Sequence, residues 1–313
     1  MTSDFRFHIN WWSVASTRLV RVAFLFSIFL FGGLFPSQAG QPLVSAQWLN
    51  DHLMDENLRV IDLQQPEGYA KIHIDGAVNS QFARWRQPKP KEGLVLPNTP
   101  YLERLIGSLG IDNDTHVILA PIGFNASEIA IATRIYWTFK VLGHENISIL
   151  DGGLIAFSKL KSARWSKQTV TVSPASYVAK PDLSMAPKAK DVLAEWEKGT
   201  SLVDYRSPAE FYGKAGGTRP GTIPGAKNLP FSLLVEPVQG GHFLPKSRVE
   251  EIFAKHDVPT SGEQVAFCNS GHRASLGWFV SHEILGNKSV RLYDGSMNEW
   301  AQYPDYPVDI PKD

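Results

Sequence analysis

The sequence predicts an α/β protein with two similar domains, each a mainly parallel sheet flanked by helices. From Gly40 onward, short apolar runs of strand length alternate with segments of helical periodicity. This alternation is typical of parallel sheets covered by helices. The landmarks of the first half also recur in the second half in the same order, and a length of 313 residues fits about two domains.

Four pairs of segments carry the repeat. They are 61–62 with 203–204, 74–77 with 223–226, 142–147 with 285–290, and 150–153 with 293–296. A repeat of such long period indicates a duplicated domain and not a solenoid. Between the halves, residues 161–190 are rich in Lys, Ser, Thr and Pro, which favours an extended linker. We therefore predict a first domain at 40–165, a linker at 166–187 and a second domain at 188–313.

Apolar runs and helix caps predict the individual elements. Ser45 is expected to cap a first helix, because serine accepts a hydrogen bond from the first helical turn. In the first half we expect strands at 58–63, 116–120 and 147–150, and helices at 99–109 and 126–141. In the second half we expect strands at 201–204, 265–268 and 289–293, a strand entry at 223–230, and helices at 192–198, 248–256 and 274–285.

Residues 1–39 have the pattern of a secretory signal peptide. Arg18 and Arg21 precede an uncharged apolar run at 22–34, and the small residues Ser37 and Ala39 follow it. We predict cleavage after Ala39, a periplasmic or secreted protein, and no stable membrane association afterwards. The alternative is an uncleaved anchor, but the run of thirteen residues is shorter than the about 20 that a spanning helix needs.

Composition and charge exclude some classes of partner. The formal net charge is +0 and no basic stripe is present, so nothing favours nucleic-acid binding. We expect a monomer that acts on small molecules. The chain has one cysteine, which cannot form an internal disulfide. In an oxidising compartment such a thiol is either buried and inert or reactive.

That cysteine, Cys268, ends an apolar run and begins a polar loop. Gly271 and Arg273 follow it, and then comes a segment of apolar helical periodicity. A loop entering a helix presents unpaired amides and partial positive charge, which favour an anion. Cys268 is therefore predicted to favour the nucleophilic thiolate, with help from Arg273. The alternative is a small buried hydrophobe, the commoner fate of a lone cysteine, but the polar loop argues against it.

Several motifs around Cys268 resemble those of the tandem rhodaneses, the thiosulfate/mercaptopyruvate sulfurtransferase family. Segment 203–213 resembles the family's Asp-x-Arg-Ser-Pro-x-Glu-Phe stretch. Segment 219–226 resembles Arg-x-Gly-His-Ile-Pro-Gly-Ala, with Thr222 in place of the usual histidine. Segment 293–300 resembles the C-terminal signature, with Met297 where Trp or Phe is usual. The corresponding first-half loop, 121–127, has no cysteine, as in the family's inactive first domains.

The resemblance implies two tandem rhodanese-like domains and sulfur transfer through a persulfide on Cys268. Sulfane sulfur would pass from thiosulfate or a related donor to cyanide or a thiol, without metal or organic cofactor. The loop amides would hold the anionic persulfide, and two arginines are candidates for the donor's anionic end. The implied substrate-binding residues are Arg273, Arg219, Asn269, Ser270, Gly271 and His272. Asp204 and Arg206 are expected to be structural, and His272 to be a solvated loop histidine.

The donor and the reaction class have alternatives. The loop Cys-Asn-Ser-Gly-His-Arg is closer to single-domain rhodaneses, and Glu210 stands where the animal enzymes place a substrate arginine. These departures favour thiosulfate over mercaptopyruvate. Phosphatases and arsenate reductases of this fold use Cys-x5-Arg, whereas four residues separate Cys268 from Arg273, which favours sulfur. A sulfur-carrier or binding module without turnover is the other alternative. Whether Trp85 and Arg86 reach the site is left open.

Overall fold

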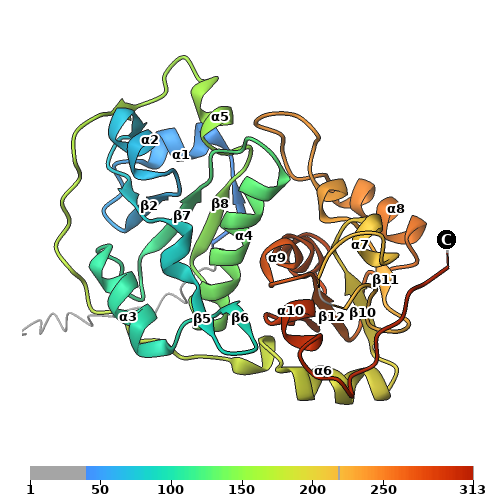
Figure 1. Ribbon diagram of the computed structural model, residues 1–313. Coiled ribbons are helices and arrows are strands. Elements are labelled where there is room, and N and C mark those ends of the chain that lie inside the picture. The colour runs from blue at the N-terminus through green and yellow to red at the C-terminus, as the bar shows by residue number, and fades with distance from the viewer. Residues whose placement is uncertain (1–39, 218, 313) are drawn as a thin grey trace, which may run out of the picture. The chain divides into compact units, whose positions relative to one another are not determined.

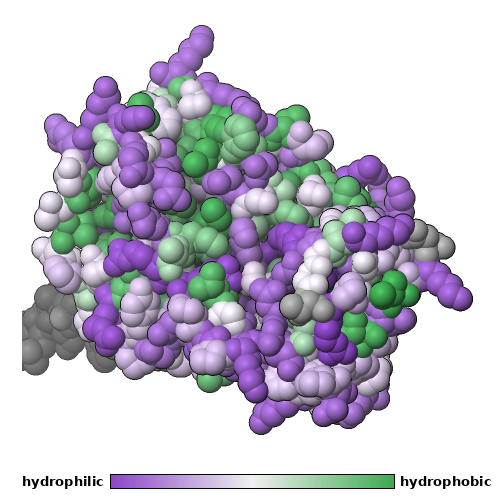
Figure 2. Space-filling view, in the orientation of Figure 1, coloured by the Kyte–Doolittle hydropathy of each residue, from purple (hydrophilic) through white to green (hydrophobic). Residues whose placement is uncertain are grey.

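The computed structural model describes residues 40–217 and 219–312. The predicted signal segment and its cleavage site after Ala39 lie outside these residues, so export stays a prediction. In the part of the chain that is described, no helix is both long and apolar enough to cross a membrane. Figure 2 shows polar side chains over most of the face drawn, with smaller apolar areas among them.

The first half is built on a parallel sheet of five strands in the order β1-β8-β7-β2-β4 (Figure 1). The strands are β1 (Leu43–Val44), β2 (Leu58–Asp62), β4 (Val78–Asn79), β7 (His116–Ala120) and β8 (Ile147–Leu150). The helices are α1 (Ala46–His52), α2 (Pro66–Lys71), η1 (Phe82–Trp85), α3 (Thr99–Ser108), α4 (Ala126–Val141) and α5 (Gly153–Ser158). The first half also contains two small antiparallel sheets of two strands each: β3 (His73–Ile74) with β9 (Trp165–Ser166), and β5 (Gln87–Lys89) with β6 (Gly93–Val95).

The second half repeats this plan with a parallel sheet in the order β11-β10-β12-β13. The strands are β10 (Ser201–Asp204), β11 (Lys227–Asn228), β12 (Gln264–Phe267) and β13 (Val290–Leu292). The helices are η2 (Leu183–Met185), α6 (Ala189–Glu197), α7 (Pro208–Phe211), η3 (Phe231–Leu234), α8 (Lys246–Lys255), α9 (His272–Phe279), η4 (Val280–Ile284) and α10 (Ser296–Trp300). Strands β11-β10-β12-β13 correspond to β4-β2-β7-β8, which confirms the duplication.

Most predicted elements are confirmed, and the helix caps and buried apolar strands that the sequence indicated are found in the structure. The Ser45 hydroxyl accepts from the amide of Trp48 at 3.1 Å, so it caps α1 as expected. Strands β8 and β12 are buried along their whole length, as apolar strands covered on both faces should be. The helix predicted at 274–285 differs. It begins two residues earlier, at His272, and its last five residues form the π-helical segment η4.

The linker lies against the first half. Between β9 and η2 the chain has no regular secondary structure, in agreement with its composition. Its backbone is held by first-half groups: the amide of Ala175 donates to the carbonyl of Gly107, and the amide of Lys180 to that of Leu142. An extended segment of this kind satisfies its backbone through the domain surface that it crosses.

The two halves share one hydrophobic core where α4 packs against α9 (Figure 1). The rings of Tyr136 and Phe279 meet edge to face with centroids 4.9 Å apart. The hydroxyls of Thr133 and Ser275 lie 2.9 Å from each other in this buried contact. This packing places first-half side chains of α4 close to the loop that precedes α9.

Candidate active site

Cys268 is the first residue after β12, at the carboxyl end of the parallel sheet. The loop that follows turns sharply at Gly271, which has φ +69° and precedes α9. A Cβ added to Gly271 would lie 2.6 Å from the Asp294 carboxylate, so both the backbone and the space require glycine there. Cys268 itself is 1% exposed. The thiol is therefore buried, within the core that the two halves share, and is not displayed on the surface.

Ser296 fixes the loop from the segment after β13. Its hydroxyl accepts from the amides of Cys268 at 3.0 Å and Gly271 at 3.1 Å, and donates to the carbonyl of Tyr293. The next amide, that of Met297, donates to the carbonyl of Cys268 at 3.0 Å. This serine was not among the predicted site residues, although it lies in the segment 293–300 that resembles the family's C-terminal signature. These bonds hold the peptide that carries the thiol.

The remaining loop amides are available. The amides of Asn269, Ser270, His272 and Arg273 have no hydrogen-bond acceptor among residues 40–217 and 219–312. Two of them open α9, where the helix dipole adds partial positive charge. The amide of Gly271 is engaged by Ser296, and the predicted contact of the other four with a persulfide stays a prediction. Unpaired amides at a helix start can bind an anion, and the terminal sulfur of a persulfide would be one.

Three arginines interact electrostatically with Cys268: Arg86, Arg134 and Arg273. Arg86 comes from the segment after η1 and donates to the carbonyl of Ser270 at 2.6 Å. Burial lowers the pKa of Arg86 to about 10, and the neighbouring Arg134 acts in the same direction. Positive charge beside a cysteine stabilises the thiolate, which is the nucleophilic form. The first half therefore supplies part of the positive charge at the site.

Of Trp85 and Arg86, Arg86 reaches the loop of Cys268 and Trp85 does not. Arg86 contacts the Cys268 loop, as described above. Trp85 does not, because its fully buried ring donates through Nε1 to the hydroxyl of Ser80 in the first-half core.

Arg134 is a fully buried cation in the middle of α4. Its Nη2 donates to Asp294 Oδ1 at 2.6 Å, and its guanidinium stacks over the Trp137 ring with the carbon 4.3 Å from the centroid. Asp294 also accepts from the amide of Leu96 at 2.6 Å. An arginine among apolar residues of a predicted helix was a signal that sequence analysis did not use. The pair joins both halves next to Gly271.

Arg273, the predicted contact for the donor anion, faces Glu210. Both terminal nitrogens donate to the two carboxylate oxygens, at 2.7 and 2.8 Å. The hydrogen bonds from Arg273 hold the pKa of Glu210 at about 2, so the pair is ionised. Glu210 also accepts from the side chain of Asn269 at 2.7 Å. The guanidinium fork that sequence analysis assigned to a donor is engaged by an internal carboxylate, and contact with a donor stays a prediction.

His272 is not the solvated loop histidine that the sequence suggested. Its ring lies 5.0 Å from that of Phe82, and its Nε2 is buried without a hydrogen-bond partner in the described parts of the chain. Burial lowers the pKa of His272 to about 4, and the charges of Arg86 and Arg134 add to this effect. His272 is therefore neutral at pH 7 and packs between the halves.

We expect acid to destabilise the protein through His272. The folded pKa of about 4 lies below the ordinary value of 6.5, so this contribution to stability is complete above pH 6.5 and is lost toward pH 4. In urea unfolding, the wild type should lose more stability between pH 7 and 4.5 than His272→Gln does. Equal pH slopes for the two proteins would contradict this expectation.

The residues expected to be structural form a buried group. Arg206 forms an ion pair with Asp204 at 2.6 Å, and Thr222 donates to the same carboxylate at 2.8 Å. Thr222 thus serves as a hydrogen-bond donor at the position where the family has histidine.

Arg219 donates to the backbone carbonyls of Tyr303 and Tyr306, both at 2.8 Å. It braces the C-terminal segment, and its predicted contact with substrate stays a prediction.

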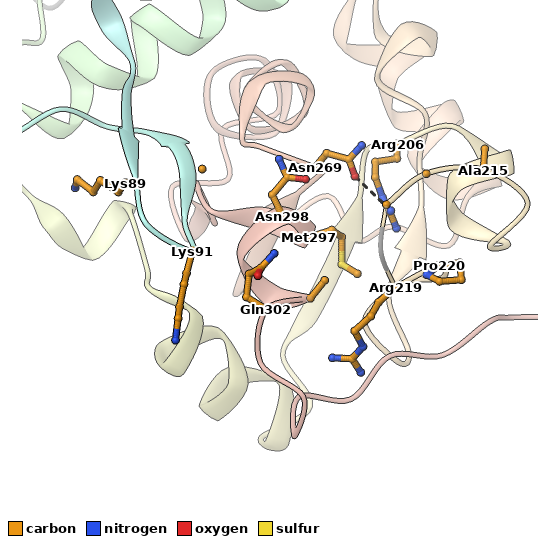
Figure 3. Close-up of a pocket in the computed structure, with 14 residues that line it drawn as sticks. Lys89, Lys91, Arg206, Ala215, Arg219, Pro220, Asn269, Met297, Asn298 and Gln302 are labelled. Atoms are coloured by element: carbon orange, nitrogen blue, oxygen red, sulfur yellow. Dashed lines mark hydrogen bonds between the residues drawn. The ribbon is translucent and has the colours of Figure 1, made fainter.

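A pocket of ≈ 470 Å³ opens beside the Cys268 loop (Figure 3). Asn269 and Met297, which flank the thiol-bearing peptide, form part of its wall. Its cationic lining residues are Lys89, Lys91, Arg206 and Arg219. Among the described residues, no group of three or more His, Cys, Asp or Glu side chains could hold a metal ion.

Comparison with known proteins places this chain in a family. The model of the rhodanese-like domain matches residues 45–160 and 188–303. A protein of Mycolicibacterium smegmatis, provisionally named a thiosulfate sulfurtransferase, is 32% identical over 280 residues, covering 86% of this chain and 97% of its own. A relative from Haloferax volcanii with the same provisional name is 30% identical, covering 85% and 96%.

Solved structures show the same fold. The 3-mercaptopyruvate sulfurtransferase SseA from Escherichia coli superposes with a TM-score of 0.70 at 26% identity. The likeness covers 82% of this chain and 98% of SseA. EanB superposes with a TM-score of 0.73 at 21% identity, covering 88% of this chain and 72% of EanB, and shows the fold alone.

Proposed function

Because this chain belongs to the rhodanese family of sulfurtransferases, we propose that it moves sulfane sulfur from thiosulfate to cyanide or a thiol through a persulfide on Cys268. The observation that carries the proposal is the position of the thiol. It lies between a parallel strand and a helix start, beside unpaired amides and three arginines. The provisional names of the relatives support thiosulfate as donor.

The proposed reaction consists of two exchanges at sulfur. The Cys268 thiolate attacks the outer sulfur of thiosulfate, the sulfur–sulfur bond of the donor breaks, and sulfite leaves with the electron pair. A nucleophile then attacks the terminal sulfur of the persulfide, and the new sulfur–sulfur bond breaks to return the thiolate. Neither step needs an external oxidant or reductant. A nucleophilic thiolate and a good leaving group are sufficient.

The groups around Cys268 have distinct roles in this proposal. The amides of Asn269, Ser270, His272 and Arg273 stabilise the negative charge on the persulfide, as an oxyanion hole stabilises oxygen. Arg86 and Arg134 add a fixed positive field from the first half. We also propose that Arg273 contacts the sulfonate end of the donor, sharing its guanidinium with Glu210.

A comparison of two donors tests the proposal. With cyanide as acceptor, we expect the purified protein to form thiocyanate from thiosulfate with a higher kcat/KM than from 3-mercaptopyruvate. The likeness to SseA makes mercaptopyruvate the second candidate, and a reversed ranking would select it. Hydrolysis of an aryl phosphate without thiocyanate would favour a phosphatase. Binding without turnover of either donor would favour a carrier module.

A further inference from the structure

A second cavity lies where the two halves and the linker meet, and we call it the junction cavity. Its volume of ≈ 540 Å³ lies in the range of about 300–1,000 Å³ that holds small organic ligands. Its walls come from β5, the start of α3, the end of α4, the linker with η2, and the start of α6. Of the described residues, only Lys89 lines both this cavity and the pocket beside the Cys268 loop. The proposed sulfur transfer therefore gives the junction cavity no role.

Most of the lining of the junction cavity is apolar. Together with three prolines, the apolar lining residues are Leu96, Leu102, Val141, Leu142, Leu183 and Ala186. Leu183 is 63% exposed, so apolar surface remains for a ligand to cover. A cavity between domains that has apolar walls and few charges is typical of a binding site for a small organic molecule.

Three of the four charges on these walls are compensated within the protein. Asp294 is bound by Arg134, and Lys188 lies 3.2 Å from Glu92. Asp191 accepts from the amide of Lys188 at the start of α6, where the helix dipole stabilises a carboxylate. None of these three charges requires a ligand.

Lys89 is the fourth charge, and its ammonium is uncompensated. It has no hydrogen-bond or ion-pair partner among the residues that the structure describes. The side chain is half-buried, and in Figure 3 it points away from Met297 and Arg219 of the other pocket. A single cation beside apolar walls favours a ligand that carries one negative group on an apolar body.

The β5–β6 hairpin that carries Lys89 is attached at both ends to the loop that carries the thiol. Arg86, just before β5, donates to the carbonyl of Ser270 in that loop at 2.6 Å. Leu96, just after β6, donates through its amide to Asp294 Oδ2 at 2.6 Å, and Asp294 lies against the same loop. A ligand that touches Lys89 and Leu96 therefore contacts the segment that holds the thiol loop in place.

We propose that the junction cavity binds a small carboxylic acid with an apolar body, and that this ligand stabilises the closed loop around Cys268. The carboxylate pairs with Lys89, and the apolar body covers Leu183 and Leu96. Because the ligand holds the hairpin, it also holds the contacts that the hairpin makes with the loop. The inference goes beyond the function proposed above and does not depend on the identity of the sulfur donor.

Calorimetry with three probes of equal chain length tests the binding site. Octanoate carries the expected carboxylate, 1-octanol is neutral, and octylamine is a cation. The wild type should bind octanoate most tightly and octylamine least tightly. In Lys89→Gln, the Kd for octanoate should rise about three- to fivefold, as expected for a partly exposed ion pair, while the Kd for 1-octanol stays unchanged.

Matched variants locate the binding. Lys91→Gln removes the other hairpin lysine, which does not line the junction cavity, and should leave the Kd values of all three probes unchanged. Leu183→Gln removes an exposed apolar contact and should weaken octanoate and 1-octanol alike. Leu94→Gln, at a leucine that is 47% exposed and lines neither cavity, should weaken neither probe. Absence of octanoate binding, equal octanoate binding in the wild type and Lys89→Gln, or tighter binding of octylamine would overturn the site.

Alkylation of Cys268 tests the link to the loop, whether or not the protein transfers sulfur. Cys268 is the only cysteine and is 1% exposed, so iodoacetamide reaches it when the loop opens. At about ten times its Kd, octanoate should slow alkylation severalfold, with about tenfold as the limit if the open loop abolishes binding. The same octanoate concentration should slow Lys89→Gln less. An unchanged or faster rate would overturn the link, whereas absence of sulfur transfer alone would overturn only the function proposed above.

Discussion

Replacing Cys268 by serine is expected to abolish persulfide formation and thiocyanate production. A serine hydroxyl does not ionise near neutral pH, so the nucleophile of the first step, which is also the leaving group of the second, is lost. The mass of the intact protein after thiosulfate treatment measures the first step directly. The wild type should gain the mass of one sulfur atom, and Cys268→Ser should gain none. Because Cys268 is the only cysteine, no other thiol can replace it.

The environment of Cys268 requires a second variant. The side chain is buried in the core that the two halves share, where a serine hydroxyl without a partner costs about 1–3 kcal/mol. Cys268→Ala brings no polar group into this site and should also be inactive while it remains folded. Thermal unfolding of both variants checks the fold. Thiocyanate production by either folded variant would refute the persulfide mechanism.

Replacing Arg134 by methionine is expected to destabilise the protein by about 3–5 kcal/mol, because it leaves a buried carboxylate without its cation. The side chains of Arg134 and Asp294 are 0% and 7% exposed, so solvation by water compensates poorly for the lost partner. Among the residues that the structure describes, Asp294 would keep only the amide of Leu96 as hydrogen-bond donor. Urea unfolding gives the change in the free energy of unfolding.

A double substitution shows whether the loss comes from the unpaired charge. Arg134→Met combined with Asp294→Asn removes both charges and should recover part of the stability that the single variant loses. The single variant should also lower the persulfide yield, because Asp294 lies against Gly271 in the thiol loop. A change below about 1 kcal/mol in Arg134→Met would contradict the role assigned to this pair.

Local signals predicted the elements around Cys268 well. An apolar run, a glycine and a periodic helix lie within a short stretch, and the structure has β12, the loop and α9 there. The helix begins earlier than expected because Gly271 adopts the left-handed conformation and directly precedes the first turn. Ser296 was not predicted, since its bonds to the loop connect segments that follow different strands.

The charges of the site were harder to predict. The sequence pointed to Arg273 but could not show that Glu210 holds it, because that contact depends on how the segment after β10 approaches α9. Arg86 and Arg134 belong to the other half, and only the packing of α4 on α9 brings them near the thiol. The same packing buries His272, which looks like an ordinary loop residue in the sequence.

By itself, the sequence determined the duplicated α/β plan and the placement of the lone thiol between a strand and a helix. Apolar periodicity, turns and helix caps are local properties, so they can be recognised along the chain. The tertiary structure alone decided which charges neutralise one another and which remain open in the pocket. A buried charge requires a partner, and that partner comes from whichever segment folding brings within a few ångströms.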